Sequence, residues 1–311
     1  MSSSPSSIGR SGAALLIVFW LIGALSLIIA VSLKLLKQDL DTALLDSKEF
    51  RATQLAETGL ALAAHPDVEK EDPLLVRVYQ NGVEGYRVRL TTEAAKINPN
   101  YVLIRGQVSL LSQLFLNWGL DETEATEVAE SLKDWVDEDE LAELNGAERD
   151  WYLEQEREGY PFDRPFYNLD EMALSRGMER VAEVRPDWRS FFSLLSRGPI
   201  DVNHADAETL AAAAEVPLDA ARSFVELRVG PDLLPETEDD LLYQSVDEAL
   251  GALGSFLPAD QRADRFTVND SMVRIESTGW VDNFEKTVVL VLQSKSPNPI
   301  VMSRREQSRL R

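Results

Sequence analysis

Two hydrophobic patterns follow one another directly in the first 64 residues. Residues 12–33, GAALLIVFWLIGALSLIIAVSL, form an uncharged run of 22 residues. As a helix this run is about 33 Å long, enough to cross a bilayer core of about 30 Å. Small and apolar residues then recur at helical spacing as far as Ala64, and Pro66 ends the pattern. The pattern predicts one continuous helix over about 13–64, although an anchor followed by a separate helix is an alternative.

A cleaved secretory signal is a second interpretation of the apolar run. Such signals usually have about 7–15 apolar residues followed by a small-x-small cleavage site. The run here is longer, but sites of this kind occur inside it at Ala24 and Ala30. Basic residues stand on both sides of the run, so the positive-inside rule gives little direction.

Strand patterns appear on both sides of a long helical segment. Residues 74–91 alternate around Asn81-Gly82 and predict a hairpin. Residues 271–279 and 286–293 predict two more strands, the second apolar on both faces as in a central strand. Between them, about 105–265 has the 3.6-residue spacing of helices. The order predicts a sheet domain that carries a large helical insertion.

The charge balance and the rare residue types narrow the classes of function. The chain has 53 acidic and 31 basic residues, a net charge of −22, which argues against binding to a phosphate backbone. It has no Cys, and its only histidines are His65 and His204, so disulfides and multi-histidine metal sites are excluded. No nucleophile-elbow, P-loop or dinucleotide motif occurs. A membrane-anchored hydrolase that uses His204 or the acidic residues is an alternative function. We expect no catalysis, because none of these motifs supports it.

Acidic residues are concentrated in one stretch, which holds 16 acids and three bases over residues 121–160. A solvated acidic surface is the simplest interpretation. However, Asp134, Asp137 and Asp139 are closely spaced, and Glu148 follows after Gly146. Oxygen atoms from such a loop can converge on one Ca²⁺, which takes 6–8 of them, although no full EF-hand loop is present. These four carboxylates are our candidate calcium ligands.

Residues 200–228 resemble a helix-hairpin-helix of the kind found in membrane-anchored competence proteins that bind nucleic acid. In that motif a glycine-rich turn offers backbone N–H groups to phosphate. The expected turn here, residues 215–219, has no glycine and carries two acids, Glu215 and Asp219. We therefore expect the hairpin shape without nucleic-acid binding, and expect Asn203 to be the cap at a helix start.

The N-terminus resembles type IV pilins and the pseudopilins of type II secretion. These proteins have a short polar leader, a glycine and a helix that is first transmembrane and then amphipathic. The resemblance implies that a prepilin peptidase cuts between Gly12 and Ala13. Most members carry a glutamate at the fifth mature position, which here is Ile17. The absence of that glutamate is characteristic of one family, the minor pseudopilin K.

Four internal motifs also resemble the pseudopilin K family: AKINPN (95–100), KDWVDEDE with NGAERDWY (133–152), RPFYNLDEMALSRGM (164–178) and IDVNHADAETLAAAAEVP (200–217). The second is the most specific. The chain departs from the family where His204 replaces a usual threonine, and where Asp163 or Arg164 stands at a common asparagine. Its leader also has a single basic residue.

The resemblance implies an α+β fold, in which a pilin-like long N-terminal helix packs on a small antiparallel sheet and a large α-helical domain is inserted. It implies a non-enzymatic minor pseudopilin at the tip of the type II secretion pseudopilus. The implied partners are the I-type and J-type minor pseudopilins, the major pseudopilin and the prepilin peptidase, and the implied cofactor is calcium. The implied location is the inner membrane, crossed once, with a cytoplasmic N-terminus and a periplasmic C-terminal domain.

The expected segments are a leader (1–12), a transmembrane helix (13–34), the amphipathic helix with the first strands (35–104), an inserted acidic α-domain (105–265), the closing strands (266–293) and a flexible basic tail (294–311). The tail is assigned because it has five bases, one acid and two prolines.

Overall fold

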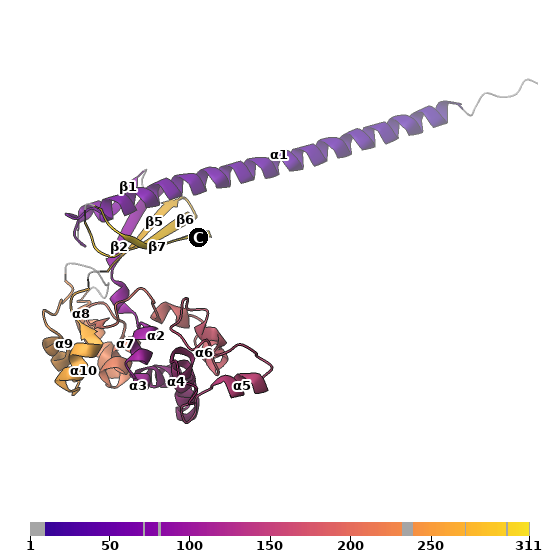
Figure 1. Cartoon of the computed structure of the whole chain (residues 1–311). Helices are drawn as coiled ribbons and strands as arrows, with labels where there is room; N and C mark the ends of the chain where they lie inside the picture. Colours follow the sequence, from indigo (N-terminus) through magenta and orange to yellow (C-terminus); the bar gives the residue numbers. More distant parts are fainter. Residues whose placement is uncertain are drawn as a thin grey trace, which may run out of the picture.

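One uninterrupted helix, α1 (Arg10–Ala63, 54 residues), forms the N-terminal part of the chain. The computed structural model describes residues 10–70, 72–79, 82–231, 239–270, 272–296 and 298–310. At 1.5 Å per residue α1 is about 80 Å long. Figure 1 shows the sheet beside the C-terminal end of α1 and the helical domain beyond the sheet, while the rest of α1 extends away from both. The prediction of a single helix rather than two is confirmed.

A five-stranded antiparallel sheet is built in the order β1-β2-β5-β6-β7. Its strands are β1 (Val76–Tyr79), β2 (Glu84–Thr91), β5 (Val273–Val281), β6 (Phe284–Leu292) and β7 (Val301–Leu310). The predicted hairpin is present as β1 and β2, which pair from Tyr79 with Glu84 outward. Gly82 in its connection has φ +96°, a conformation that favours glycine, and Asn81 lies outside the described residues.

The C-terminal half of α1 packs on this sheet at close range. Leu55, Ala56, Leu60 and Ala63 of α1 are buried with residues of β2, β5 and β6 in one apolar cluster. The Ser277 hydroxyl on β5 donates a hydrogen bond of 2.7 Å to the Ala56 carbonyl. Small residues on both elements therefore bring the helix and sheet backbones together, which positions the sheet on the last quarter of α1.

The predicted flexible tail over 294–311 is wrong for residues 301–310, which form β7. This strand pairs antiparallel with β6 over most of its length, from Phe284 opposite Leu310 to Leu292 opposite Val301. The physical reason is that β6, apolar on both faces, lies inside the sheet and needs a hydrogen-bonding neighbour on each side. Some charges of the strand are paired, since Arg304 contacts Glu57 of α1 and Glu306 of β7 itself.

Helices fill the segment between β2 and β5 and enclose a second apolar core. They are α2 (Pro99–Ile104), α3 (Val108–Trp118), α4 (Glu122–Val136), α5 (Arg149–Glu154), α6 (Met178–Val184), α7 (Ala207–Ala214), α8 (Leu218–Arg228), α9 (Val246–Leu253) and α10 (Ala259–Arg265). A short parallel pair, β3 (Ile200–Asp201) with β4 (Phe266–Thr267), joins two distant parts of this α-domain. The largest fully buried side chains of the described residues, Trp135 and Trp188, belong to it. The α+β fold with an inserted helical domain is confirmed.

Candidate functional site

The N-terminal part of α1 exposes many large apolar side chains, and in the described part of the chain its first ion pairs with the sheet domain are made by Lys48 and Glu49. Its large apolar residues from Leu16 to Phe50 are exposed, whereas Ala52 and Ala56 are fully buried against the sheet. Among the described residues, α1 is the one helix long and apolar enough to cross a membrane. Gly12 and Ala13 lie within α1, but the described side chains begin at Leu16.

Ile17, at the position where most pilin-like proteins carry a glutamate, is 60% exposed on this surface. An isoleucine there presents an uncharged side chain to lipid or to a neighbouring helix, and so avoids the cost of an unpaired carboxylate in hydrocarbon. The surface of α1 from residue 16 to residue 50 is called the rod surface below.

The acidic loop after α4 folds back over the end of that helix. Asp134, in the last turn of α4, is fully buried, and its Oδ1 and Oδ2 accept hydrogen bonds of 3.1 and 3.3 Å from the Glu143 N–H. Gly146 comes so close that a Cβ on it would lie 1.9 Å from Asp134 Oδ2. The absence of a side chain at 146 therefore allows the loop to close on the carboxylate.

Burial and the repulsion of nearby negative charges raise the pKa of three carboxyl groups in and near this loop. Burial, together with the negative charges of Asp137 and Glu143, raises the pKa of Asp134 to about 6. Burial, followed by the charges of Asp134 and Asp163, raises the pKa of Glu148 to about 7. Burial also raises the pKa of Asp163.

Two oxygen atoms of this group, Glu148 Oε1 and Asp137 Oδ1, are buried without a hydrogen-bond partner in the part of the chain that the structure describes. The other oxygen of Asp137 accepts from Lys133 Nζ at 2.6 Å. Buried acceptors without donors are costly, and a cation would satisfy them. The structure thus brings Asp134, Asp137 and Glu148 into one electrostatic group.

Asp139 has a different place in the loop, because its Oδ1 accepts the Leu141 N–H at 2.8 Å in an exposed turn. Asp163, which we did not include among the candidate ligands, belongs to the group instead. Its only signal in the sequence was its position where the family commonly has asparagine. As the side chains stand, no set of three or more His, Asp or Glu residues within the described ranges is arranged around a metal position.

Aromatic side chains of the α-domain core pack against the loop. Trp135 and Tyr152 are fully buried, with ring centroids 5.8 Å apart in an edge-to-face contact. Tyr160 and Phe166 stack on Trp135 at 5.4 and 6.2 Å. Trp135 and Tyr152 are therefore core aromatics, and the KDWVDEDE and NGAERDWY motifs come together through them.

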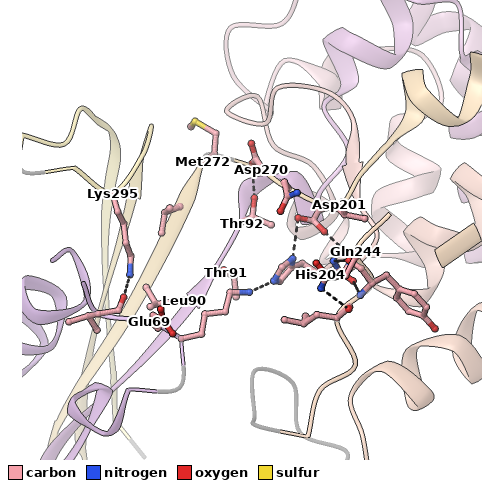
Figure 2. Close-up of a pocket in the computed structure, with 18 of the residues that line it drawn as sticks. Glu69, Leu90, Thr91, Thr92, Asp201, His204, Gln244, Asp270, Met272 and Lys295 are labelled. Atoms are coloured by element: carbon pink, nitrogen blue, oxygen red, sulfur yellow. Dashed lines mark hydrogen bonds and ion pairs between the residues drawn. The ribbon is translucent and has the colours of Figure 1, made fainter. Parts of the chain in front are cut away.

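A cavity of about 430 Å³ lies where the α-domain meets the sheet domain. The Lys70 ammonium, from the segment after α1, contacts His204 of the α-domain. Figure 2 shows that the His204 ring also faces Asp201. His204 Nδ1 lies 3.2 Å from Asp201 Oδ2, and Asp201 in turn accepts the Asn203 N–H at 2.9 Å. These groups form a polar contact that links the two domains.

The helix-hairpin-helix shape predicted over 200–228 is present as α7 and α8. The prediction that Asn203 caps α7 is wrong, because its amide exchanges hydrogen bonds with the backbone of Tyr243 and Asp206 is the residue that caps the helix. In the turn, Glu215 adopts φ +56° and pairs with Arg265 at 2.8 Å, while Pro217 has no N–H to donate. This turn does not offer the row of N–H groups that a phosphate site needs.

Comparison with known proteins gives a family match over part of the chain and a shared fold over most of it. Residues 95–186 match the family described as type II secretion system (T2SS), protein K. Among solved structures, a chain of the GspK–GspI–GspJ complex from enterotoxigenic Escherichia coli has a TM-score of 0.58 and 20% identity, over 87% of this chain and 98% of that chain. A search of curated proteins gives no match. The family match over residues 95–186 and the fold shared across most of the chain together support a GspK-type minor pseudopilin.

Proposed function

We propose that this protein acts at the tip of the type II secretion pseudopilus, in protein export across the outer membrane, by assembly with other pilin-like subunits rather than by catalysis. The observation that carries the proposal is the division of α1 into two parts. The rod surface is apolar and exposed, while residues 52–63 are docked on the protein's own sheet. An exposed apolar surface of this size needs either lipid or neighbouring helices.

The α-domain determines where such a subunit fits in a filament. It is much larger than the sheet from which it emerges, because 181 residues separate Thr91 of β2 from Val273 of β5. In a filament of stacked pilin-like domains a domain of this size blocks the addition of another subunit on its own side. Ile17 agrees with this position, since a subunit without a neighbour above it gains nothing from a buried carboxylate.

The proposed partners follow from the solved complex, which joins GspK to GspI and GspJ. We propose that the rod surface contacts the helices of I-type and J-type minor pseudopilins and, below them, the major pseudopilin. Before assembly α1 would cross the inner membrane once, with the N-terminus cytoplasmic and the remaining domains periplasmic. Prepilin peptidase would cleave between Gly12 and Ala13 and release the leader.

Single-cysteine cross-linking tests the assembly role, because the natural chain has no cysteine. We expect Leu36→Cys on the rod surface to form disulfides with matched cysteines in the helices of the I-type and J-type pseudopilins in membranes. Phe256→Cys is the control, since Phe256 is 98% exposed but lies in the α-domain. Cross-linking that is equal at both positions, or confined to Phe256→Cys, would contradict the proposal.

N-terminal sequencing of the membrane-extracted protein, with and without prepilin peptidase, tests the processing step. We expect a mature chain that begins at Ala13 only when the peptidase is present. A chain that begins beyond residue 24 would instead indicate a secretory signal.

We also propose that Ca²⁺ binds the acidic loop, held by Asp134, Asp137 and Glu148 with Asp163 nearby. The fit rests on the two buried oxygens without donors and on the raised pKa values of Asp134 and Glu148. A bound cation would supply positive charge that favours the ionised carboxylates and holds the loop against α4. Asp139, an expected ligand, is the residue for which the geometry gives least support, because its oxygen caps an exposed turn.

Thermal unfolding of the full-length protein in detergent, with Ca²⁺ or with chelator, tests this site. At 100 times the dissociation constant, Ca²⁺ should stabilise the α-domain by about 2.7 kcal/mol. Glu148→Gln should remove most of that increase. Glu183→Gln, at an exposed position of α6, should leave it intact. An unfolding temperature that is the same in Ca²⁺ and in chelator would refute calcium binding.

A further inference from the structure

A second cavity, of about 420 Å³, lies on the β6–β7 side of the junction between the sheet and the α-domain. Its floor is formed by Val289 and Val291 of β6, and Met302 and Ser303 of β7 form one wall. The α-domain contributes Phe192, whose side chain is buried. Both domains therefore build the cavity, and its volume is in the range of small-ligand sites, about 300–1,000 Å³.

The cavity is cationic although the whole chain has a net charge of −22. Four basic side chains line it, and two acidic ones. The bases are Lys96, Arg189, Arg274 and Arg305, and the acids are Glu93 and Asp170. Basic residues are the minority in this protein, so their concentration at one junction is not a consequence of composition.

Both acids of the cavity are already neutralised by direct contacts. Glu93 is buried, and its Oε1 lies 2.9 Å from Arg274 Nη1 while its Oε2 accepts from the Ser193 hydroxyl. Asp170 pairs with Arg189 at 2.8 Å at the exposed edge. No carboxylate is left to neutralise the remaining cations directly.

Lys96 and Arg305 are those remaining cations. Across the described ranges of the chain, neither side chain has an ion pair or a side-chain hydrogen bond. Nearby charged groups do act on Lys96 through space. Burial is the largest effect that lowers the pKa of Lys96, and the charges of Arg274 and Arg305 act in the same direction, while Glu93 and Glu276 oppose them. A bound anion would stabilise the charged Lys96 ammonium in this cavity.

We propose that this cavity binds an oxyanion, a carboxylate or a phosphate, through Lys96, Arg305 and Arg274. The planar Arg305 guanidinium can offer two parallel N–H donors to such a group, and the Lys96 ammonium is a further donor. Arg274, whose Nη1 and Nη2 already face Glu93 and Glu276, adds positive charge. The apolar floor from β6 suits a ligand whose anionic group is carried on an apolar body. This site lies apart from the rod surface and from the calcium loop, and it does not depend on the proposed function.

Titration calorimetry on the full-length protein in a non-ionic detergent tests the site. The probes are inorganic phosphate, citrate and an end-capped tetraglutamate peptide, each at two salt concentrations. We expect saturable binding of at least one probe, weakened by salt, and at least a tenfold loss of affinity in Lys96→Met and in Arg305→Gln. Lys96→Arg should keep the charge and most of the affinity. Arg222→Gln, on the exposed surface of α8 outside the cavity, is the matched control.

The results distinguish a free small oxyanion from an acidic side chain of a partner, and also show whether the proposal fails. Binding of phosphate or citrate indicates a free small oxyanion, whereas binding of tetraglutamate alone indicates an acidic side chain of a partner polypeptide. In ¹³C-methylated protein, the Lys96 signal should titrate at higher pH when the probe is bound, a change that misfolding does not produce. The proposal is refuted if no probe binds saturably, or if Arg222→Gln weakens binding as much as Lys96→Met.

Discussion

Gly279 of β5 is the position where the docking of α1 on the sheet is most sensitive to a single added atom. A Cβ there would lie 2.1 Å from the Ala52 carbonyl oxygen and 2.6 Å from the Ala56 nitrogen, both backbone atoms of α1. Backbone atoms cannot rotate aside, so Gly279→Ala must move the helix away from the strand and open the contact made by Leu55. Overpacking of this kind costs about 1–3 kcal/mol, and we expect the upper half of that range.

Hydrogen exchange on the full-length protein in detergent measures this effect where it arises. A loss of 1–3 kcal/mol corresponds to roughly 5- to 150-fold faster exchange through opening of α1, β5 and β6. Amides of the α-domain should be unchanged, because its core is a separate cluster. Gly251→Ala in α9 is the control: a Cβ there meets nothing within 4 Å, so helix propensity predicts about 0.5–1 kcal/mol of stabilisation. Unchanged exchange in α1 and β5 of Gly279→Ala would refute the reasoning.

Three further predictions concern other parts of the chain. Burial would raise the pKa of Glu93, but Ser193, Lys96 and Arg274 outweigh it and the pKa is lowered. A carboxyl group whose pKa is lower in the folded state stabilises the fold at pH values above its unfolded-state pKa. That stability is lost as the pH falls through its folded-state pKa. The fall in urea midpoint below about pH 4.5 should therefore be shallower in Glu93→Gln. Deletion of residues 300–311 should expose the edge of β6 and produce concentration-dependent association in sedimentation, which full-length protein at the same concentration should not show. Without Ca²⁺, Glu148→Gln should raise the unfolding temperature of the α-domain at pH 8, because it removes a buried charge; a decrease would contradict the electrostatic account of the loop.

The sequence was most informative where one periodicity extends over many residues. The helix over 13–64 and the strands near 271–279 and 286–293 follow from periods that a single element imposes on its own residues. The tail failed as a prediction because β7 has no such period: its charged side chains pair with Glu57 of α1, which is distant in sequence, and with Lys286 of the neighbouring strand β6. Strand formation there is a tertiary effect, and local propensity carries little information about it.

The candidate calcium site could likewise be predicted only in part. Asp134, Asp137 and Glu148 lie close in sequence on one loop, so their spacing was a usable signal. Asp163 reaches the same group only because the aromatic contacts of Trp135 bring its segment back. The cationic cavity was not predictable at all, since Lys96 and Arg305 are 209 positions apart and meet through β7.

The insertion of the α-domain between adjacent strands has a consequence for the order of folding. β2 and β5 pair directly, with Thr91 opposite Arg274, so their register requires the ends of a 181-residue segment to meet. Closing a flexible loop of that length costs about 5 kcal/mol of chain entropy. If the α-domain forms first around its own core, the two strand ends are held near each other before they pair, and most of that cost is removed. The helical domain should therefore be the folding nucleus of this protein, and the pilin-like sheet should be the later and slower product of non-local contacts.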